Sequence, residues 1–128
     1  MIKVVAMLRR REGLTHEEFF AYYEEKHLPL AWGLLPDEVT AVVVHYVQNH
    51  ARRLGGSEPP FDCVTEIGFA DADGMRVYNE WYLGPGGAAI RADEDNFVDK
   101  ERSKVLITDE HQAAFAENWV SRVRVAGA

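Results

Sequence analysis

The sequence predicts an α+β fold with one antiparallel sheet, and three observations carry this prediction. The first is the order of strand-like and helix-like segments, the second is a capped aromatic helix near the N-terminus, and the third is the apolar character of the early strands. The chain has 128 residues, of which 47% are hydrophobic, which suits one domain with a packed core. We therefore expect a single domain over residues 1–128, with its core at about residues 2–111.

β-Branched and apolar runs predict four strands, and helical spacing predicts the segments between them. Strands are expected at residues 2–8, 40–50, 62–69 and 103–108, and helices at residues 15–27, 71–83 and 88–97. A last helix is expected at residues 112–120, and residues 122–128 have no clear pattern. The order β, α, β, β, α, β is that of a ferredoxin-like fold, in which helices cover one face of the sheet.

The helix at residues 15–27 has signals at both ends. Thr15 and the glutamate three residues later have the spacing of a capping box. Because proline disfavours the α conformation in the residue before it, Pro29 predicts that the helix ends at about His27. Helical spacing places His27 with Phe20 and Tyr23 and points it toward the interior. A buried imidazole at a helix C-terminus is a tunable acid or base, although such a histidine is more often only a cap.

The first two strands present apolar side chains on both faces. Helices would cover one face only, so the other face needs a second layer. An open apolar face is an aggregation liability on a monomer, and a second copy packed sheet against sheet is the simplest way to cover it. We expect a two-fold homodimer.

Charge and composition argue against several classes of protein. A net charge of -7 disfavours a nucleic-acid partner. The lone cysteine, Cys63, cannot form an intrachain disulfide, the N-terminus lacks the features of a signal peptide, and no apolar run approaches the ~20 residues that span a membrane. We expect a soluble, cytoplasmic protein that binds no membrane. Glu24 and His27 supply only two ligands at helical spacing, so no metal site is expected.

Carboxylates on the third predicted strand are further catalytic candidates. Alternation places Asp62 and Glu66 on one face, where they would orient His27 or act as a proton relay. The structural alternative is that they pair with Arg9 or Lys3 on a neighbouring strand. The acidic run at residues 93–95 is interpreted as a solvated helix end.

The second predicted strand adds two candidates. His50 and Tyr46 share one face of it, and His50 is a secondary catalytic candidate. His45 lies on the other face and is expected to be a packing or dimer contact. Four aromatic residues are expected to line an apolar pocket, namely Tyr23, Trp32, Tyr46 and Trp81.

An ordered set of short motifs resembles the EthD family over roughly residues 2–111. The motifs are His27-Leu28-Pro29-Leu30, Gln48-Asn49-His50, the segments at residues 61–66 and 92–97, and Asp109-Glu110-His111. The resemblance implies a dimeric α+β barrel and matches His27 to a helix-exit histidine of several enzymes. Relatives in the wider superfamily act without a metal or organic cofactor as polyketide cyclases, lactone isomerases and quinone-forming monooxygenases, while other branches bind heme. Cys63 and Thr65 depart from the family pattern, and both fall on the helix-packed side.

These observations favour a small cofactor-independent enzyme that acts on a hydrophobic oxygenated ring compound. A polyketide, a lactone or a related intermediate of degradation or biosynthesis fits, with His27 moving a proton to or from carbon or oxygen. One alternative is a heme-binding or heme-degrading protein. Another is a ligand-binding module whose pocket does no chemistry.

Overall fold

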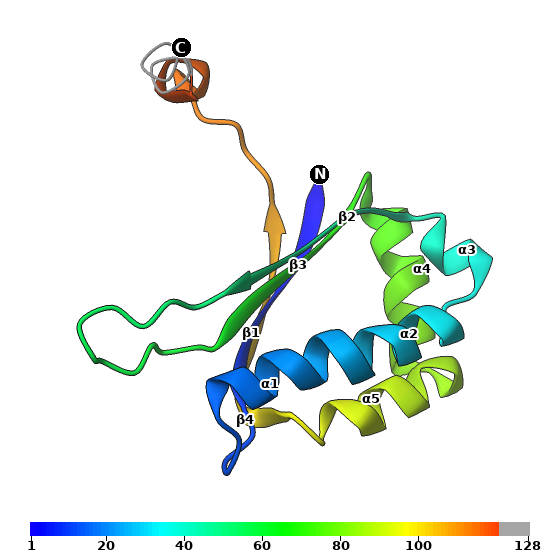
Figure 1. Ribbon diagram of the computed structural model, residues 1–128. Helices are drawn as coiled ribbons and strands as arrows, with labels where there is room; N and C mark the ends of the chain where they lie inside the picture. The colour runs from blue at the N-terminus through cyan, green and yellow to red at the C-terminus, as the bar shows by residue number, and fades with distance from the viewer. Residues whose placement is uncertain (121–128) are drawn as a thin grey trace.

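The computed structural model describes residues 1–120, which form a four-stranded antiparallel sheet with its helices on one face (Figure 1). The strands are β1 (Ile2–Arg10), β2 (Val43–His50), β3 (Cys63–Phe69) and β4 (Val98–Asp109). They lie in the order β2-β3-β1-β4, with β1 between β3 and β4. The predicted ferredoxin-like arrangement is confirmed.

Five short α-helices make up the layer over the sheet: α1 (His16–Tyr22), α2 (Leu28–Leu34), α3 (Asp37–Thr40), α4 (Ala72–Leu83) and α5 (Ala88–Glu94). The predicted start of α4 is confirmed, because Asp71 Oδ1 accepts a hydrogen bond of 2.9 Å from the Gly74 backbone N–H. A turn at Pro85–Gly87 leads directly into α5. A Cβ atom at Gly87 would lie 2.1 Å from the Tyr82 carbonyl oxygen, so only glycine fits where the chain folds back against α4.

The first helix does not end at Pro29. Its capping box is confirmed, but α1 continues through a π-helical turn at Tyr23–His27 into α2. Leu28 keeps helical backbone angles (φ −61°, ψ −45°), and its N–H bonds to the carbonyl of Tyr23, five residues back. Proline has no N–H, and its ring collides with the carbonyl four residues earlier in an α-helix, whereas a π turn is wider. The predicted helix end was therefore wrong, and His27 lies in mid-helix.

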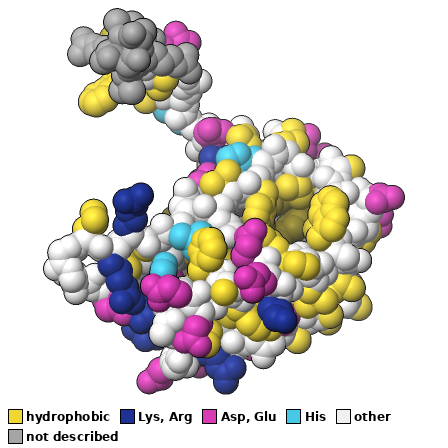
Figure 2. Space-filling model, viewed as in Figure 1, with side chains coloured by type: hydrophobic (Ala, Val, Ile, Leu, Met, Phe, Trp, Pro, Cys, Tyr) yellow, Lys and Arg dark blue, Asp and Glu magenta, His cyan; other side chains and the backbone are white. Residues whose placement is uncertain are grey.

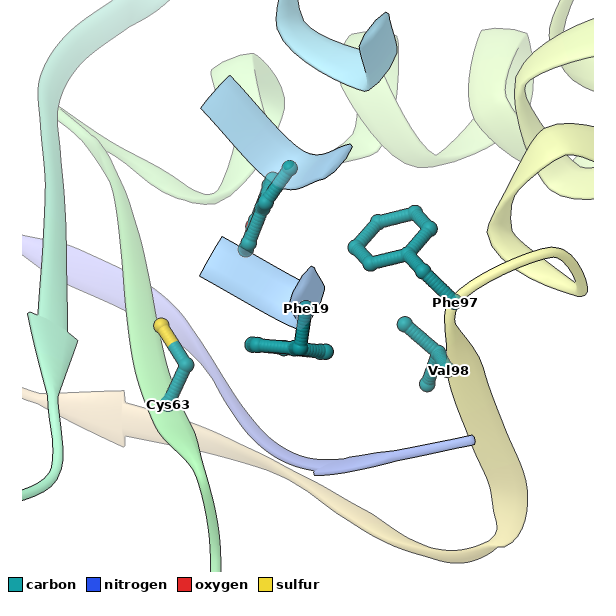
Figure 3. Close-up of a cluster of buried hydrophobic side chains, with 5 residues drawn as sticks. Phe19, Cys63, Phe97 and Val98 are labelled. Atoms are coloured by element: carbon teal, nitrogen blue, oxygen red, sulfur yellow. The ribbon is translucent and has the colours of Figure 1, made fainter. Parts of the chain in front are cut away.

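The core lies between α1 and the sheet. Phe19 is fully buried and packs with Cys63 of β3 and with Phe97 and Val98 where β4 begins (Figure 3). The ring centroids of Phe19 and Phe97 are 5.5 Å apart. Phe20, which the helical spacing had placed inside, is 45% exposed. The buried face thus runs from Phe19 through the π turn and fixes the position of His27.

The helix layer leaves a hollow above the sheet. Figure 2 shows this hollow lined with hydrophobic side chains, over the space that Figure 1 shows between β2, α2 and α4. Helix-facing positions of β3 include Cys63, Thr65 and Phe69, all of which are buried. The departures from the family pattern at Cys63 and Thr65 therefore fall on the helix side, as predicted.

The chain after the last strand extends away from the sheet (Figure 1). β4 spans Val98–Asp109 and is longer than the predicted strand. Residues 116–120 are helical, and Phe115 and Trp119 are exposed. Residues 122–128, for which no element was predicted, lie outside the described residues. None of the helices in residues 1–120 is both long and apolar enough to cross a membrane.

Candidate functional site

His27 is buried in the π turn and is held by a carboxylate of α5. Only 7% of the residue is exposed, and its Nδ1 lies 2.9 Å from Asp93 Oδ2. The other carboxylate oxygen of Asp93 accepts hydrogen bonds from the Tyr22 hydroxyl (2.7 Å) and the Asn96 side-chain amide (3.2 Å). Burial raises the pKa of Asp93, but the hydrogen bonds from Tyr22, His27 and Asn96 outweigh burial and bring the pKa below its ordinary value.

The ionised carboxylate fixes the tautomer of His27. A carboxylate can only accept hydrogen bonds, so Nδ1 of His27 carries the hydrogen and Nε2 of the neutral ring carries the lone pair. Nε2 of His27 has no hydrogen-bond partner among the described residues. The side-chain nitrogen there that is both buried and without a partner is His50 Nδ1, so Nε2 of His27 is not buried and remains accessible. The imidazole packs against Tyr23 and Phe97, at centroid distances of 5.7 and 4.9 Å. This is the geometry of an oriented base.

The sequence did not identify Asp93 as a site residue, because residues 93–95 were interpreted as a solvated helix end. Its side chain is only 15% exposed. The carboxylate that orients His27 is therefore Asp93, and neither Asp62 nor Glu66 fills this place.

Asp62 joins three parts of the fold. It is fully buried and accepts hydrogen bonds from the Arg10 backbone N–H (2.8 Å), Arg10 Nη1 (2.8 Å) and His16 Nδ1 (3.0 Å). Burial raises the pKa of Asp62, but the hydrogen bonds from Arg10 and His16 outweigh it and keep the pKa below its ordinary value. Its arginine partner is Arg10 rather than the expected Arg9. These contacts tie the end of β1 and the start of α1 to the start of β3.

Glu66 lies on the open face of the sheet, away from the helices. It pairs with Lys3 at 2.7 Å, the structural alternative considered from the sequence, and accepts hydrogen bonds from Asn49 (2.9 Å) and His45 (3.3 Å). The hydrogen bond from Lys3, followed by that from Asn49, lowers the pKa of Glu66 to about 2. Because Glu66 and the buried Thr65 are consecutive, the sheet separates Glu66 from the helix side.

Polar side chains at alternate positions of β2 form a chain on the helix side. His50 Nε2 lies 2.9 Å from Gln48 Oε1, and Gln48 Nε2 donates to the Tyr46 hydroxyl at 2.9 Å. The His50 ring lies edge-on to Phe20, with centroids 4.4 Å apart, and its Nδ1 is buried with no hydrogen-bond partner among residues 1–120. Burial, with His16 as a lesser cause, lowers the pKa of His50. Gln48 was not recognised from the sequence, although it lies between Tyr46 and His50 at the period of two that relates them.

A buried pair of hydroxyls continues this chain to the π turn. Tyr23 and Thr65 are hydrogen-bonded at 2.8 Å, and the Tyr23 hydroxyl lies 3.4 Å from that of Tyr46. Burial raises the pKa of Tyr23 and of Tyr46, so both are neutral hydroxyls at physiological pH. Cys63 Sγ contacts both ends of this chain, at 3.6 Å from Thr65 Oγ1 and 3.8 Å from His50 Nε2.

The structure brings together some of the aromatic residues expected to line the pocket. Tyr23 and Tyr46 meet where β2 approaches the π turn. Trp81 lies on α4 beside Tyr78, with ring centroids 6.4 Å apart. Trp32 is 73% exposed and lies on the surface. No group of three or more His, Cys, Asp or Glu side chains with the geometry of a metal site is found in residues 1–120.

The family assignment follows from a comparison with known domains. The model of the EthD domain matches residues 11–101. The chain belongs to the EthD family. This membership agrees with the motifs noted in the sequence, and both His27 and Asp93 lie inside the matched region. None of the curated proteins matches this EthD chain.

Solved structures share the fold at low identity. An EthD family protein from Bacillus halodurans C-125 is 17% identical, with 87% of this chain and 99% of that chain covered and a TM-score of 0.62. An EthD-like protein from Ralstonia eutropha JMP134 is 21% identical, with coverages of 88% and 91% and a TM-score of 0.56. A dimeric protein of ferredoxin-like fold from Bacteroides fragilis NCTC 9343 is 9% identical, with coverages of 85% and 95% and a TM-score of 0.52.

The Lys3–Glu66 pair predicts a pH-dependent contribution to stability. The folded-state pKa of Glu66 is about 2, below the ordinary 4.5, so the unfolded chain binds more protons as the pH falls between these values. The contribution is present above about pH 4.5 and is lost as the pH falls toward 2. We expect Glu66→Gln to lower the free energy of unfolding at neutral pH and to have a smaller effect near pH 3, as measured by urea denaturation. The control is Glu80→Gln, because Glu80 pairs with Arg76 at an exposed position. An equal effect of Glu66→Gln on the free energy of unfolding at both pH values would contradict the prediction.

Proposed function

We propose that this EthD protein is a small enzyme that uses His27 as a general base on a hydrophobic ring compound that carries a ketone or phenol oxygen. The observation that carries the proposal is the hydrogen bond of 2.9 Å from His27 Nδ1 to the carboxylate of Asp93, which leaves Nε2 as an accessible acceptor. A carboxylate in this position fixes the ring orientation and stabilises the imidazolium that forms when Nε2 takes a proton.

The surroundings support an apolar ligand. Pockets for small molecules are mostly apolar and contain a few placed polar groups. The hollow in Figure 2 is lined with hydrophobic side chains, and the hydroxyls of Tyr23 and Tyr46 lie between β2 and the π turn. Polyketides and lactones have this combination of apolar rings and carbonyl oxygens. Base and orienting carboxylate are both side chains of the EthD chain, so the proposed proton transfer uses no metal or organic cofactor.

A heme protein is the second candidate. A histidine whose Nδ1 is hydrogen-bonded to a carboxylate and whose Nε2 is accessible could also hold the iron of a heme. Titration with heme tests it directly, because binding through His27 would shift and sharpen the Soret band of heme, and His27→Gln would weaken this change. A ligand-binding module without chemistry is the remaining alternative, and it would return its bound ligand unchanged after prolonged incubation.

Exchange of carbon-bound hydrogen tests the base. The ketone 2-tetralone has acidic hydrogens beside its carbonyl and a hydrophobic bicyclic frame, and NMR in D₂O follows their replacement by deuterium. We expect the protein to accelerate this exchange above the buffer rate and His27→Gln to lower the acceleration by roughly 10²- to 10⁴-fold, the usual contribution of a positioned acid or base. Gln keeps hydrogen-bonding capacity but cannot carry the proton.

The matched control is His111→Gln, because His111 is exposed beyond β4. The control should exchange 2-tetralone as the wild type does. Equal exchange rates for wild type and His27→Gln would contradict the proposal, and so would a wild-type rate no higher than that of the buffer.

We also propose that the EthD chain forms a homodimer through the open face of its sheet. This face carries Glu66, and the register of β1 with β3 and β4 places Leu106 on the same side. Leu106 is 53% exposed and Val47, paired with Glu66, is 38% exposed. The Bacteroides fragilis protein of similar fold is described as dimeric.

Light scattering tests the dimer. We expect a mass twice that of the chain at micromolar concentration, and a single-chain mass for Leu106→Glu, because an unpaired charge is costly in an apolar interface. Leu83→Glu, at a leucine on α4 that is 69% exposed, should leave the dimer intact. A wild-type mass equal to one chain would refute the dimer.

A further inference from the structure

Three side chains at alternate positions of β2 form one hydrogen-bonded chain that leads from the half-buried His50 to the exposed Tyr46. Side chains two residues apart on a strand share a face, which places Tyr46, Gln48 and His50 in a row. Both links of the chain measure 2.9 Å. The exposed fraction of Tyr46 is 43%, and the buried Nδ1 of His50 has no hydrogen-bond partner in the part of the chain that the structure describes.

The donors and acceptors of this chain run in one direction. The side-chain oxygen of Gln48 can only accept, so Nε2 of His50 carries a hydrogen and donates it to Gln48. The amide nitrogen of Gln48 can only donate, and it donates to the oxygen of Tyr46. The Tyr46 oxygen is therefore an acceptor within the chain, and the hydrogen of its own hydroxyl is left to point elsewhere.

Within the described residues, the neighbouring hydroxyl of Tyr23 is a poor partner for this hydrogen. The two tyrosine oxygens are 3.4 Å apart, whereas O–H···O hydrogen bonds are usually about 2.7–2.8 Å long. Tyr23 already has a partner at 2.8 Å in Thr65, and both of these residues are buried. Among residues 1–120 the Tyr46 hydroxyl thus has only the long contact of 3.4 Å to Tyr23 for its hydrogen, which a ligand oxygen at a shorter distance could replace, and burial keeps the pKa of Tyr46 above its ordinary value.

We propose that Tyr46 is the oxygen-binding residue of the site, donating a hydrogen bond to the ketone, enolate or phenol oxygen of a ring compound, and that Gln48 and His50 position its hydroxyl. This inference rests on the proposed function and adds to it the polar group that the ligand must carry. Tyr23 lies one turn before His27, with ring centroids 5.7 Å apart, so Tyr46 beside Tyr23 and the base are on the same side of the sheet. Removal of a proton beside a carbonyl develops negative charge on the carbonyl oxygen, and a placed donor stabilises that charge.

Paired ligands test the oxygen site without any reaction. The probes are 2-naphthol and naphthalene, which share an apolar frame and differ by one hydroxyl oxygen, and calorimetry measures the ratio of their affinities. We expect wild-type protein to prefer 2-naphthol, and Tyr46→Phe to weaken 2-naphthol binding about three- to tenfold, as for one hydrogen bond, with naphthalene binding unchanged. Tyr82→Phe, which removes a hydroxyl bonded to Glu94 between α4 and α5, is the control and should keep the preference.

A second variant tests the positioning residues. In Gln48→Glu the amide that donates to Tyr46 becomes a carboxylate that accepts, so the Tyr46 hydrogen should turn toward it and the preference for 2-naphthol should fall. A merely structural role of Gln48 would lower the affinity for both probes alike. Circular dichroism checks that each variant is folded.

The outcomes separate this inference from the proposed function. An unchanged affinity ratio in Tyr46→Phe overturns the oxygen site, and so does wild-type protein that binds neither probe or binds both equally. If the ratio depends on Tyr46 but 2-tetralone exchange is not accelerated, the oxygen site stands and the proton-transfer function fails. If 2-tetralone exchange depends on His27 but Tyr46→Phe leaves the affinity ratio unchanged, the proton-transfer function stands and the oxygen site fails.

Discussion

The hydrogen bond between His27 and Asp93 is the interaction on which the candidate site of this EthD protein depends. It joins the π turn of the first helix to α5, two segments separated by 66 residues in the chain. Each partner is held in place by other parts of the fold. The core around Phe19 fixes the helix on which His27 lies, and the tight turn at Gly87 returns α5 to the position from which Asp93 reaches the imidazole. One hydrogen bond then decides which nitrogen of the ring is free to act as a base.

Local signals in the sequence were enough for most of the fold. The capping box at Thr15, the cap at Asp71 and the alternation of the strands act over a few residues, and the structure bears them out. The end of the first helix was the main error. The rule for Pro29 assumes α geometry, and the chain instead widens into a π turn, whose buried side supplies tertiary contacts through Tyr23 and His27.

The candidate site could be predicted only in part. Helical spacing found the buried His27, but no local pattern links it to Asp93, since an acidic run beside a helix end has the composition of a solvated surface. Alternation grouped Asp62 with Glu66, yet β3 begins at Cys63, so Asp62 lies outside the strand and turns toward Arg10 and His16. The backbone of Asp62 still bonds to Leu8 and Ala51, but the chain bends there just before β3, and the alternation of the strand does not hold through the bend.

The role of Asp93 in orienting His27 is tested by the tautomer of His27, which ¹⁵N NMR of the imidazole ring measures without a ligand or substrate. We expect the neutral ring to carry its hydrogen on Nδ1 in the wild type, with Nε2 unprotonated. Asp93→Asn should weaken this preference, because a side-chain amide can donate as well as accept a hydrogen bond. A wild-type ring with its hydrogen mainly on Nε2 would rule out His27 as the proposed base, since the accessible nitrogen would then be a donor.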